Sequence, residues 1–301
     1  MEHWAWTWVL FTLLAALMQS VRTAAQKHLS SRMSAMAATY VRYLYGLPWV
    51  VIYMLWLGGG LEHIRGLSLQ AWYWILFGGV TQILGTWALV KVFSRRNFAV
   101  GSTFSKTEAL QTAIIGAVFL SIPLSVSGWI SVLVGMLGIV ALILPSNALN
   151  WSAWFTPVTG LGLLCGFSFA VSALAVYQSS QLTGLAPLLS AALVLVVMVC
   201  IQLTVVTLWL LLFERGAFIA VYRQWPWSLF VGLCSAVGSV GWFTAMSLQN
   251  PALVRTLGQI EFLFSLLLTW FLFGERIRRN EWLGCGLIIT SVLILLSGQA
   301  F

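Results

Sequence analysis

Long apolar runs alternate with short polar breaks along nearly the whole chain. A helix needs roughly 20 apolar residues to cross the hydrocarbon core of a bilayer, and ten runs come close to that length. Glycine, proline, asparagine or charged residues fill the breaks, where they end helices or favour turns. The pattern predicts an all-α integral membrane protein of ten transmembrane helices, at residues 4–26, 35–57, 71–93, 98–120, 126–145, 154–177, 186–213, 226–248, 252–273 and 281–298.

The second half of the chain repeats the first at a constant offset of 153 residues. Between residues 72–129 and 225–282, 13 of 58 aligned pairs are identical, and only two of these are leucine pairs. Apolar composition alone is therefore a poor explanation for the match. The offset carries predicted spans 3 to 5 onto spans 8 to 10, whereas spans 1 and 2 match spans 6 and 7 by position only. We predict two five-helix repeats, residues 1–147 and 148–301.

The charges of the breaks indicate that the two repeats are inverted. The loop after span 3 has three basic side chains within residues 91–96, whereas the equivalent loop near residues 248–251 carries none. Conversely, residues 121–127 are uncharged, whereas 274–280 carry three arginines and one glutamate. An odd number of spans per repeat reverses the second copy in the membrane, and the charge bias reverses with it. Inverted repeats are typical of secondary transporters, whose substrates bind where the repeats meet.

The composition excludes an ordinary soluble domain. Hydrophobic residues make up 60% of the chain and charged residues only 7%, against about a quarter in soluble domains. The net charge of +8 comes from basic residues gathered at one predicted membrane face, which the positive-inside rule assigns to the cytoplasm. We therefore expect both termini outside, no cleaved signal peptide and no nucleic-acid partner. Four isolated cysteines offer neither metal spacing nor a disulfide framework, so no metal and no cofactor are expected.

Short motifs at the span ends add a family resemblance. They are Asn250-Pro251-Ala252 opening span 9, Phe273-Gly274-Glu275 closing it, Gly284-Cys285-Gly286 entering span 10, and Tyr40-Val41-Arg42 in span 2. With the inverted ten-span plan, they resemble the drug/metabolite transporter superfamily, EamA type. The resemblance implies a transporter fold, with substrates among amino acids and other metabolites, nucleotide sugars, sugar phosphates and drugs. The chain departs from the family pattern in span 4, which lacks the closing Gly-Glu and carries more charge at residues 104–108.

Ionisable residues within the predicted spans are the first candidates for function. Such a residue costs about 2.5–3.5 kcal/mol on insertion scales and normally faces a cavity or a partner. Glu108 and Glu261 obey the offset, one near the middle of span 4 and one near the middle of span 9. They either meet a proton, a cation or the substrate at the midplane, or pair with basic neighbours to fix helix packing. For Arg42 we predict a structural ion pair with Glu108.

Three further polar residues of spans 4 and 9 break the symmetry of the repeat. Lys106 lies two residues before a glutamate, about 200° around a helix, so it needs another partner. An anionic substrate group and Glu261 are the two candidates, and snorkelling to the interface is the structural alternative. Arg255 and Gln259 lie one turn apart on one face of span 9. That face either meets an anionic substrate or lets the arginine reach interfacial water.

Aromatic and amide side chains at mid-span complete the candidate site. Most of the 17 tryptophans flank span ends as interfacial anchors. Trp87 and Trp242 lie within spans 3 and 8, where they either stack on an aromatic or quaternary substrate or pack against lipid. Gln19 and Gln82 are candidate hydrogen-bonding groups of the same cavity.

The sequence favours a transporter over an enzyme. It has no aspartate, no mid-span histidine and no phosphate-binding glycine loop, which disfavours an intramembrane protease and an ATP-driven pump. We predict no catalytic residue and a secondary active exporter of small metabolites such as amino acids, working by alternating access, with coupling to protons as a further hypothesis. Alternatives are an importer or exchanger of a nucleoside, sugar or quaternary amine, a channel, and a membrane scaffold without transport. A lipid bilayer, specifically a bacterial inner membrane, and a monomer or homodimer are expected.

Overall fold

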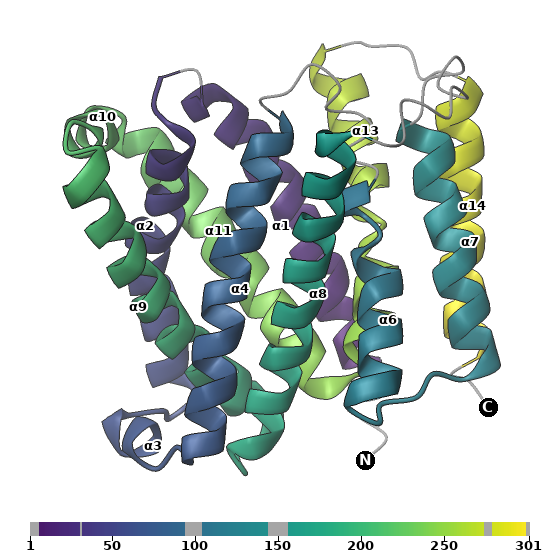
Figure 1. Ribbon diagram of the computed structural model, residues 1–301, viewed down its shortest axis with the longest axis horizontal. Coiled ribbons are helices and arrows are strands. Elements are labelled where there is room, and N and C mark those ends of the chain that lie inside the picture. Colours follow the sequence, from purple (N-terminus) through teal and green to yellow (C-terminus); the bar gives the residue numbers. More distant parts are fainter. Residues whose placement is uncertain (1–5, 31, 94–103, 144–155, 274–278, 299–301) are drawn as a thin grey trace. The chain divides into compact units, whose positions relative to one another are not determined.

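The computed structural model describes residues 6–30, 32–93, 104–143, 156–273 and 279–298, and these fold into α-helices and their connections without a β-strand (Figure 1). The helices are α1 (Thr7–Ser30), α2 (Ala35–Trp56), α3 (Leu61–Arg65), α4 (Leu69–Phe93), α6 (Glu108–Phe119), α7 (Val126–Ile143), α8 (Pro157–Leu182), α9 (Pro187–Phe213), α10 (Ala217–Arg223), α11 (Trp225–Leu248), α12 (Pro251–Gly258), α13 (Glu261–Phe273) and α14 (Arg279–Ser297). The predicted all-α class is confirmed for this part of the chain.

Every predicted span coincides with helical residues in the described part of the chain. Judged from length and composition, six segments among the described residues are long and apolar enough to cross a membrane, and α6 and α7 are shorter apolar helices. The six are Thr7–Ala25, Pro157–Leu182, Pro187–Phe213, Trp225–Leu248, Pro251–Leu268 and Asn280–Ser297. The structure thus supports an integral membrane protein, and the count of ten spans stays a prediction. The short helices α3 and α10 were not expected.

Local chemistry explains where several helices begin and end. The Asn250 side chain accepts a hydrogen bond from the Ala252 N–H at 2.9 Å, and Pro251 occupies the first turn of α12. Asparagine caps and first-turn prolines both favour helix starts. Gly58 after α2 and Gly184 between α8 and α9 have φ angles of +81° and +68°, a region that favours glycine.

The helices form two compact units, each drawing on both predicted repeats. Unit 1 comprises Met1–Val80 and Ala175–Leu248, and unit 2 comprises Thr81–Leu174 and Gln249–Phe301. Helices α4 and α8 therefore each contribute residues to both units.

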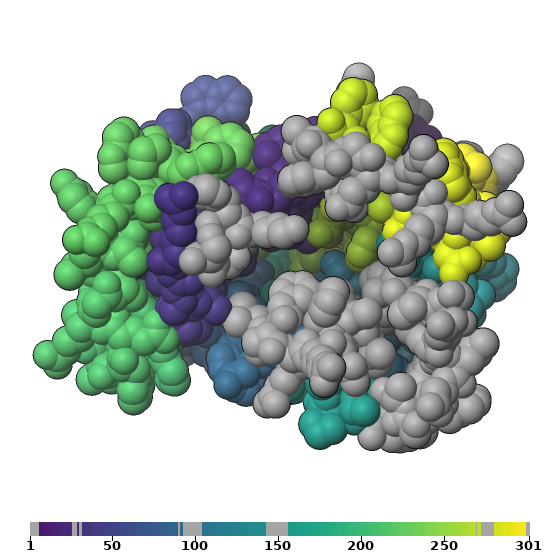
Figure 2. Space-filling model, turned by 90° about the horizontal axis from the view of Figure 1, so that it is seen from above, coloured from purple at the N-terminus to yellow at the C-terminus, as the bar shows by residue number. Residues whose placement is uncertain are grey.

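In unit 1, α11 packs against α1, α2 and α9, while α2 also packs against α9 and α10. Figure 2 shows the green residues of the α9 and α10 region beside the purple α2 region. The closest approach is at Gly232 of α11, where an added Cβ atom would lie 2.4 Å from Tyr45 Cβ and 2.7 Å from the Tyr45 carbonyl carbon. Helix α2 can thus lie against α11 only because position 232 has no side chain.

In unit 2, α7 packs along α14, and α12 packs against α6, α7 and α14 (Figure 1). Two glycines bring α7 and α14 together, since a Cβ on Gly138 would lie 3.0 Å from the Gly284 carbonyl oxygen, and one on Gly284 would lie 2.8 Å from that of Gly138. The Ser291 hydroxyl donates to the Ser131 carbonyl at 2.7 Å across the same pair. Small residues and such bonds are the usual means of joining helices in lipid.

The duplication is visible in the packing of one repeated glycine pair. Gly85 of α4 lies against the Phe169 ring of α8, 3.2 Å from an added Cβ. Its equivalent 153 residues on, Gly238 of α11, lies against Met18 and Ala15 of α1. In each unit, the third span of one repeat therefore packs on the first span of the other.

Gly232→Ala is expected to lower the melting temperature of the purified protein, because the new methyl group meets the Tyr45 backbone, and overpacking costs about 1–3 kcal/mol. Gly160→Ala is the matched control within α8, where an added Cβ meets nothing within 4 Å. The control should leave the melting temperature unchanged or slightly raised, since alanine favours helix over glycine. Equal melting temperatures for the two variants would contradict the packing described for α2 and α11.

Candidate functional site

Helices are interrupted at equivalent positions of the two repeats. The predicted span 252–273 is not one continuous helix: α12 ends at Gly258, and α13 begins at Glu261 after the turn Gln259–Ile260, called joint 2 here. In the first repeat, the turn Lys106–Thr107 directly precedes α6 and is called joint 1. The offset of 153 maps joint 1 onto joint 2.

The turns replace regular α-helical bonds with tighter ones. In joint 2, the Ile260 N–H donates to the Leu257 carbonyl at 3.1 Å, and the Phe262 N–H donates to the Gln259 carbonyl at 3.0 Å. Both bonds span three residues instead of four, as in a 3₁₀ turn. No proline marks either joint, and glycine, the other common helix-ending residue, directly precedes joint 2 alone, as Gly258.

Each joint places a glutamate at the start of the following helix. Glu108 is the first residue of α6 and Glu261 the first of α13. A carboxylate is favoured at a helix N-terminus, where free N–H groups and the helix dipole supply partial positive charge. The duplicated glutamates thus stand at helix starts near the middle of their predicted spans.

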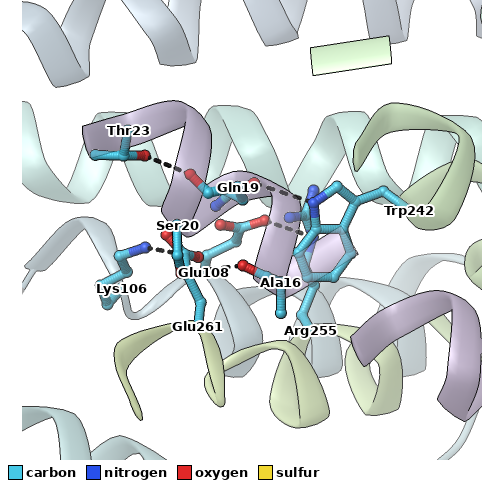
Figure 3. A network of polar contacts seen from close by, with 9 residues as sticks. All are labelled: Ala16, Gln19, Ser20, Thr23, Lys106, Glu108, Trp242, Arg255 and Glu261. Carbon is cyan, nitrogen blue, oxygen red and sulfur yellow. Dashed lines mark hydrogen bonds and ion pairs between the residues drawn. The ribbon is translucent and has the colours of Figure 1, made fainter. Parts of the chain in front are cut away.

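Two ion pairs join the glutamates to basic residues of the other repeat (Figure 3). Arg255 Nε lies 2.7 Å from Glu108 Oε1, with side chains only 15% and 14% exposed. Lys106 Nζ lies 3.8 Å from Glu261 Oε2, with side chains 27% and 16% exposed. All four residues belong to unit 2, and their formal charges sum to zero. We call them the charge cluster.

The two pairs differ in tightness. The 2.7 Å contact of Arg255 with Glu108 is the shorter of the two ion pairs and joins two largely buried groups, and breaking such a pair is costly. Lys106 forms the longer of the two ion pairs, and its side chain is the most exposed of the four. Its Nζ also lies 4.9 Å from the centroid of the Phe262 ring. A cation over a ring face is stabilised by the ring's quadrupole. Lys106 is therefore the member of the cluster most open to exchange of partners.

The ion pair of Lys106 with Glu261 confirms one of the two partners predicted for that lysine. The predicted ion pair of Arg42 with Glu108 stays a prediction, because Arg42 lies in α2 of unit 1 and Glu108 in unit 2. The partner that the structure describes for Glu108 is Arg255. Arg255 thus meets a carboxylate within its own unit.

Gln259 does not share the environment of Arg255. The side chain of Gln259 is buried. A Cβ atom added to Gly135 of α7 would lie 2.2 Å from Gln259 Oε1 and 2.8 Å from Ser291 Oγ of α14. Neither Oε1 nor Nε2 has a hydrogen-bond partner among the described residues. The role predicted for Gln259 in substrate binding stays a prediction.

The remaining candidates occupy separate places. In unit 1, the Trp242 indole N–H donates to Gln19 Oε1 at 3.0 Å, and Trp242 is buried against α1 instead of facing lipid (Figure 3). In unit 2, the Trp87 ring is 37% exposed, with Lys91 Nζ 5.7 Å from its centroid. The Gln82 carbonyl accepts from the Thr86 hydroxyl at 2.9 Å. Their predicted contacts with a substrate stay predictions.

Three residues around the joints escaped the sequence analysis. Gly166 of α8 lies against joint 1, since an added Cβ would be 3.0 Å from the Ser105 carbonyl oxygen and 3.3 Å from the Glu108 nitrogen. Phe262 lies under Lys106. Thr107 donates from its hydroxyl to the Phe104 carbonyl at 2.7 Å. A comparison of both repeats around the glutamates would have found Thr107, and no pattern in one sequence identifies the glycine.

The described residues contain no group of three His, Cys, Asp or Glu side chains placed to hold a metal ion. The carboxylates of the charge cluster already face basic side chains, so the cluster suits a charged organic group better than a metal ion. A ligand with one negative and one positive group could pair with both protein side chains of an ion pair, its negative group with the basic side chain and its positive group with the carboxylate. The chemistry offered is therefore binding by charge exchange.

A comparison with protein-family models identifies the family of the chain. The model of the EamA-like transporter family matches residues 6–144 and again residues 158–297, which together cover nearly the whole chain. The chain belongs to the EamA-like transporter family. This membership confirms the predicted resemblance and the duplication, and it indicates a membrane transporter of small molecules, not an enzyme family.

Solved structures agree on the fold of this EamA-like protein. One described as "Crystal structure of protein" matches with a TM-score of 0.76 at 14% sequence identity, covering 98% of this chain and 99% of the other. At that identity the likeness shows the fold alone. No curated protein matches the sequence.

Glu108→Gln is expected to destabilise the EamA-like protein more than Lys106→Gln. The first change removes the carboxylate that faces Arg255 in a largely buried site, where breaking an ion pair costs about 3–5 kcal/mol. The second removes the looser and more exposed pair. Melting temperatures in detergent measure the difference, and the double variant Glu108→Gln/Arg255→Gln should regain much of the loss. A larger loss for Lys106→Gln would contradict the assignment of the tight pair.

Proposed function

We propose that this protein is a secondary active transporter that binds a zwitterionic metabolite such as an amino acid at the charge cluster and moves it by alternating access. The observation that carries the proposal is a neutral cluster of four charges at two helix joints, with one tight and one loose ion pair. Discontinuous helices with their half-helix ends at a midplane site are a common design of secondary transporters.

The loose pair is suited to exchange partners with a zwitterion. A substrate carboxylate would replace Glu261 opposite Lys106, and a substrate ammonium would replace Lys106 opposite Glu261. The number of ion pairs rises from one to two, so neither protein charge is left without a partner. A substrate with only one of the two charges would strand the other protein group, which is costly in an apolar site.

The tight pair would stay closed while the substrate binds. Arg255 and Glu108 hold α12 against the start of α6 at 2.7 Å, and opening them would cost more than opening the 3.8 Å pair. The Arg255–Glu108 pair therefore acts as a fixed support. Exchange occurs at Lys106 and Glu261 alone.

Glu261 also offers a route to proton coupling. A carboxylate that can hold either a substrate ammonium or a proton binds them in competition, which couples export of one to entry of the other. Export fits this competition, with release outside and proton entry toward the basic, cytoplasmic face of a bacterial inner membrane. An importer or exchanger of another metabolite, or a scaffold without transport, remains the outcome if no zwitterion binds.

A thermal-shift screen of amino acids, nucleosides, sugars and quaternary amines tests the proposed substrate class. Amino acids are expected to raise the melting temperature of the wild-type protein, whereas the matching amine and carboxylic acid that lack one charge should not. Lys106→Gln should abolish the shift. Stabilisation by a nucleoside, a sugar or a quaternary amine alone would redirect the assignment, and no stabilisation by any compound would favour the scaffold.

Glu261→Gln is expected to abolish pH-driven amino-acid flux in proteoliposomes, because an amide cannot carry a proton. The ammonium can still hydrogen-bond to the amide oxygen, so counterflow without a pH gradient should persist at a reduced rate. Glu108→Gln, measured in parallel on folded protein, is the comparison for the fixed pair. Unchanged pH-driven flux in Glu261→Gln would contradict proton coupling through this carboxylate.

A further inference from the structure

The two joints are held in place by different side chains. In joint 1, the Thr107 hydroxyl donates to the Phe104 carbonyl at 2.7 Å, and the Gln111 amide nitrogen donates to the Thr107 hydroxyl at 2.7 Å. These two bonds tie the turn to the chain just before and just after it. Joint 1 therefore has a local lock made of its own side chains.

Joint 2 has no equivalent of this lock. The offset of 153 places Ile260 where joint 1 has Thr107, and Phe264 where it has Gln111. Neither side chain can donate or accept a hydrogen bond. The turn before α13 must be fixed in another way if Glu261 is to face Lys106 reproducibly.

Joint 2 instead anchors Gln259 in a space on the neighbouring helices. The Gln259 side chain is only 6% exposed, and its Oε1 and Cδ atoms would lie 2.2 Å and 3.1 Å from a Cβ on Gly135. Ser291 Oγ lies 2.8 Å from the same point. The amide thus occupies the volume that a side chain at position 135 would fill, between α7 and α14.

Only the first repeat has a glycine at this position, and so only it leaves this space. The equivalent of Gly135 is Ile288, whose side chain is fully buried in α14. Burying the amide of Gln259 with both polar atoms unpaired among the described residues is unfavourable by itself. A group kept in that state calls for a functional reason.

We propose that Gly135 is a positioning residue for the substrate site. Its bare backbone, together with Ser291, forms a seat for the Gln259 amide, and this seat fixes joint 2 and so the place of Glu261. The seat fixes the turn of joint 2, as the Thr107 hydroxyl fixes the turn of joint 1. The expected effect on substrate binding rests on the proposed function, whereas the seat itself does not.

A double-mutant cycle on Gly135→Ala and Gln259→Ala tests the seat without any ligand. Alanine at 135 expels the amide, and alanine at 259 removes it, so the two changes disturb the same contact. The melting temperature of the double variant should equal that of Gln259→Ala. Gly138→Ala is the control on the same helix, since its Cβ would meet Ile288 and Gly284 instead of Gln259. Its effect should add to that of Gln259→Ala.

The same variants report on positioning through the concentration of L-leucine or L-phenylalanine that gives half the maximal thermal shift. Misplacing Glu261 should raise that concentration about tenfold in each single variant, and again about tenfold, not about a hundredfold, in the double variant. Ile260→Thr supplies joint 2 with the hydroxyl of joint 1, and it should restore binding in the Gln259→Ala protein. This rescue also decides the matter if Gly135→Ala does not fold.

Additive melting temperatures in the Gly135 and Gln259 cycle would overturn the seat, and so would a Gln259→Ala protein that Ile260→Thr fails to rescue. A wild-type protein that neither amino acid stabilises would count against the proposed function alone. The ligand-free cycle would still decide whether the seat exists, so the two failures are distinguishable.

Discussion

Mutual neutralisation of four partly buried charges is the constraint on which unit 2 depends. Lys106, Glu108, Arg255 and Glu261 lie in a unit whose surroundings are apolar, where a lone charge would cost several kcal/mol. Two helix joints bring the charges together and place both carboxylates at helix N-termini. The apolar helices supply the packing, and the cluster determines which arrangement of those helices is acceptable.

Duplication supplies the framework, and departures from it make the two ion pairs unequal. Glu108 and Glu261 are equivalent, and so are the joints that precede them. Their partners are not, because the first repeat contributes a lysine where the second has a glutamine, and the second contributes an arginine where the first has a serine. One pair is therefore tight and the other loose. A symmetric cluster would hold both pairs equally and leave no preferred place for a substrate.

The sequence was sufficient for the helices and insufficient for the joints. Apolar runs located the long helices because burial in lipid requires long apolar helices, and the offset identified the repeats. The breaks at Lys106–Thr107 and Gln259–Ile260 carry neither proline nor a charge run that distinguishes them from helix. They result from contacts with other helices, such as Gly166 against joint 1 and Gly135 against Gln259, which a single sequence does not encode as a pattern. The sequence analysis included Glu261 among the predicted partners of Lys106. For Glu108 it predicted Arg42, whereas the partner that the structure describes is Arg255.

The central claim is that the loose pair opens to admit a zwitterion while the tight pair stays closed. An experimental structure with a bound amino acid measures this directly. The account predicts the substrate carboxylate on Lys106 and the ammonium on Glu261, with the distance between these two side chains increased from 3.8 Å and the Arg255–Glu108 contact kept near 2.7 Å. An amino acid bound elsewhere, with the Lys106–Glu261 pair intact, would contradict it.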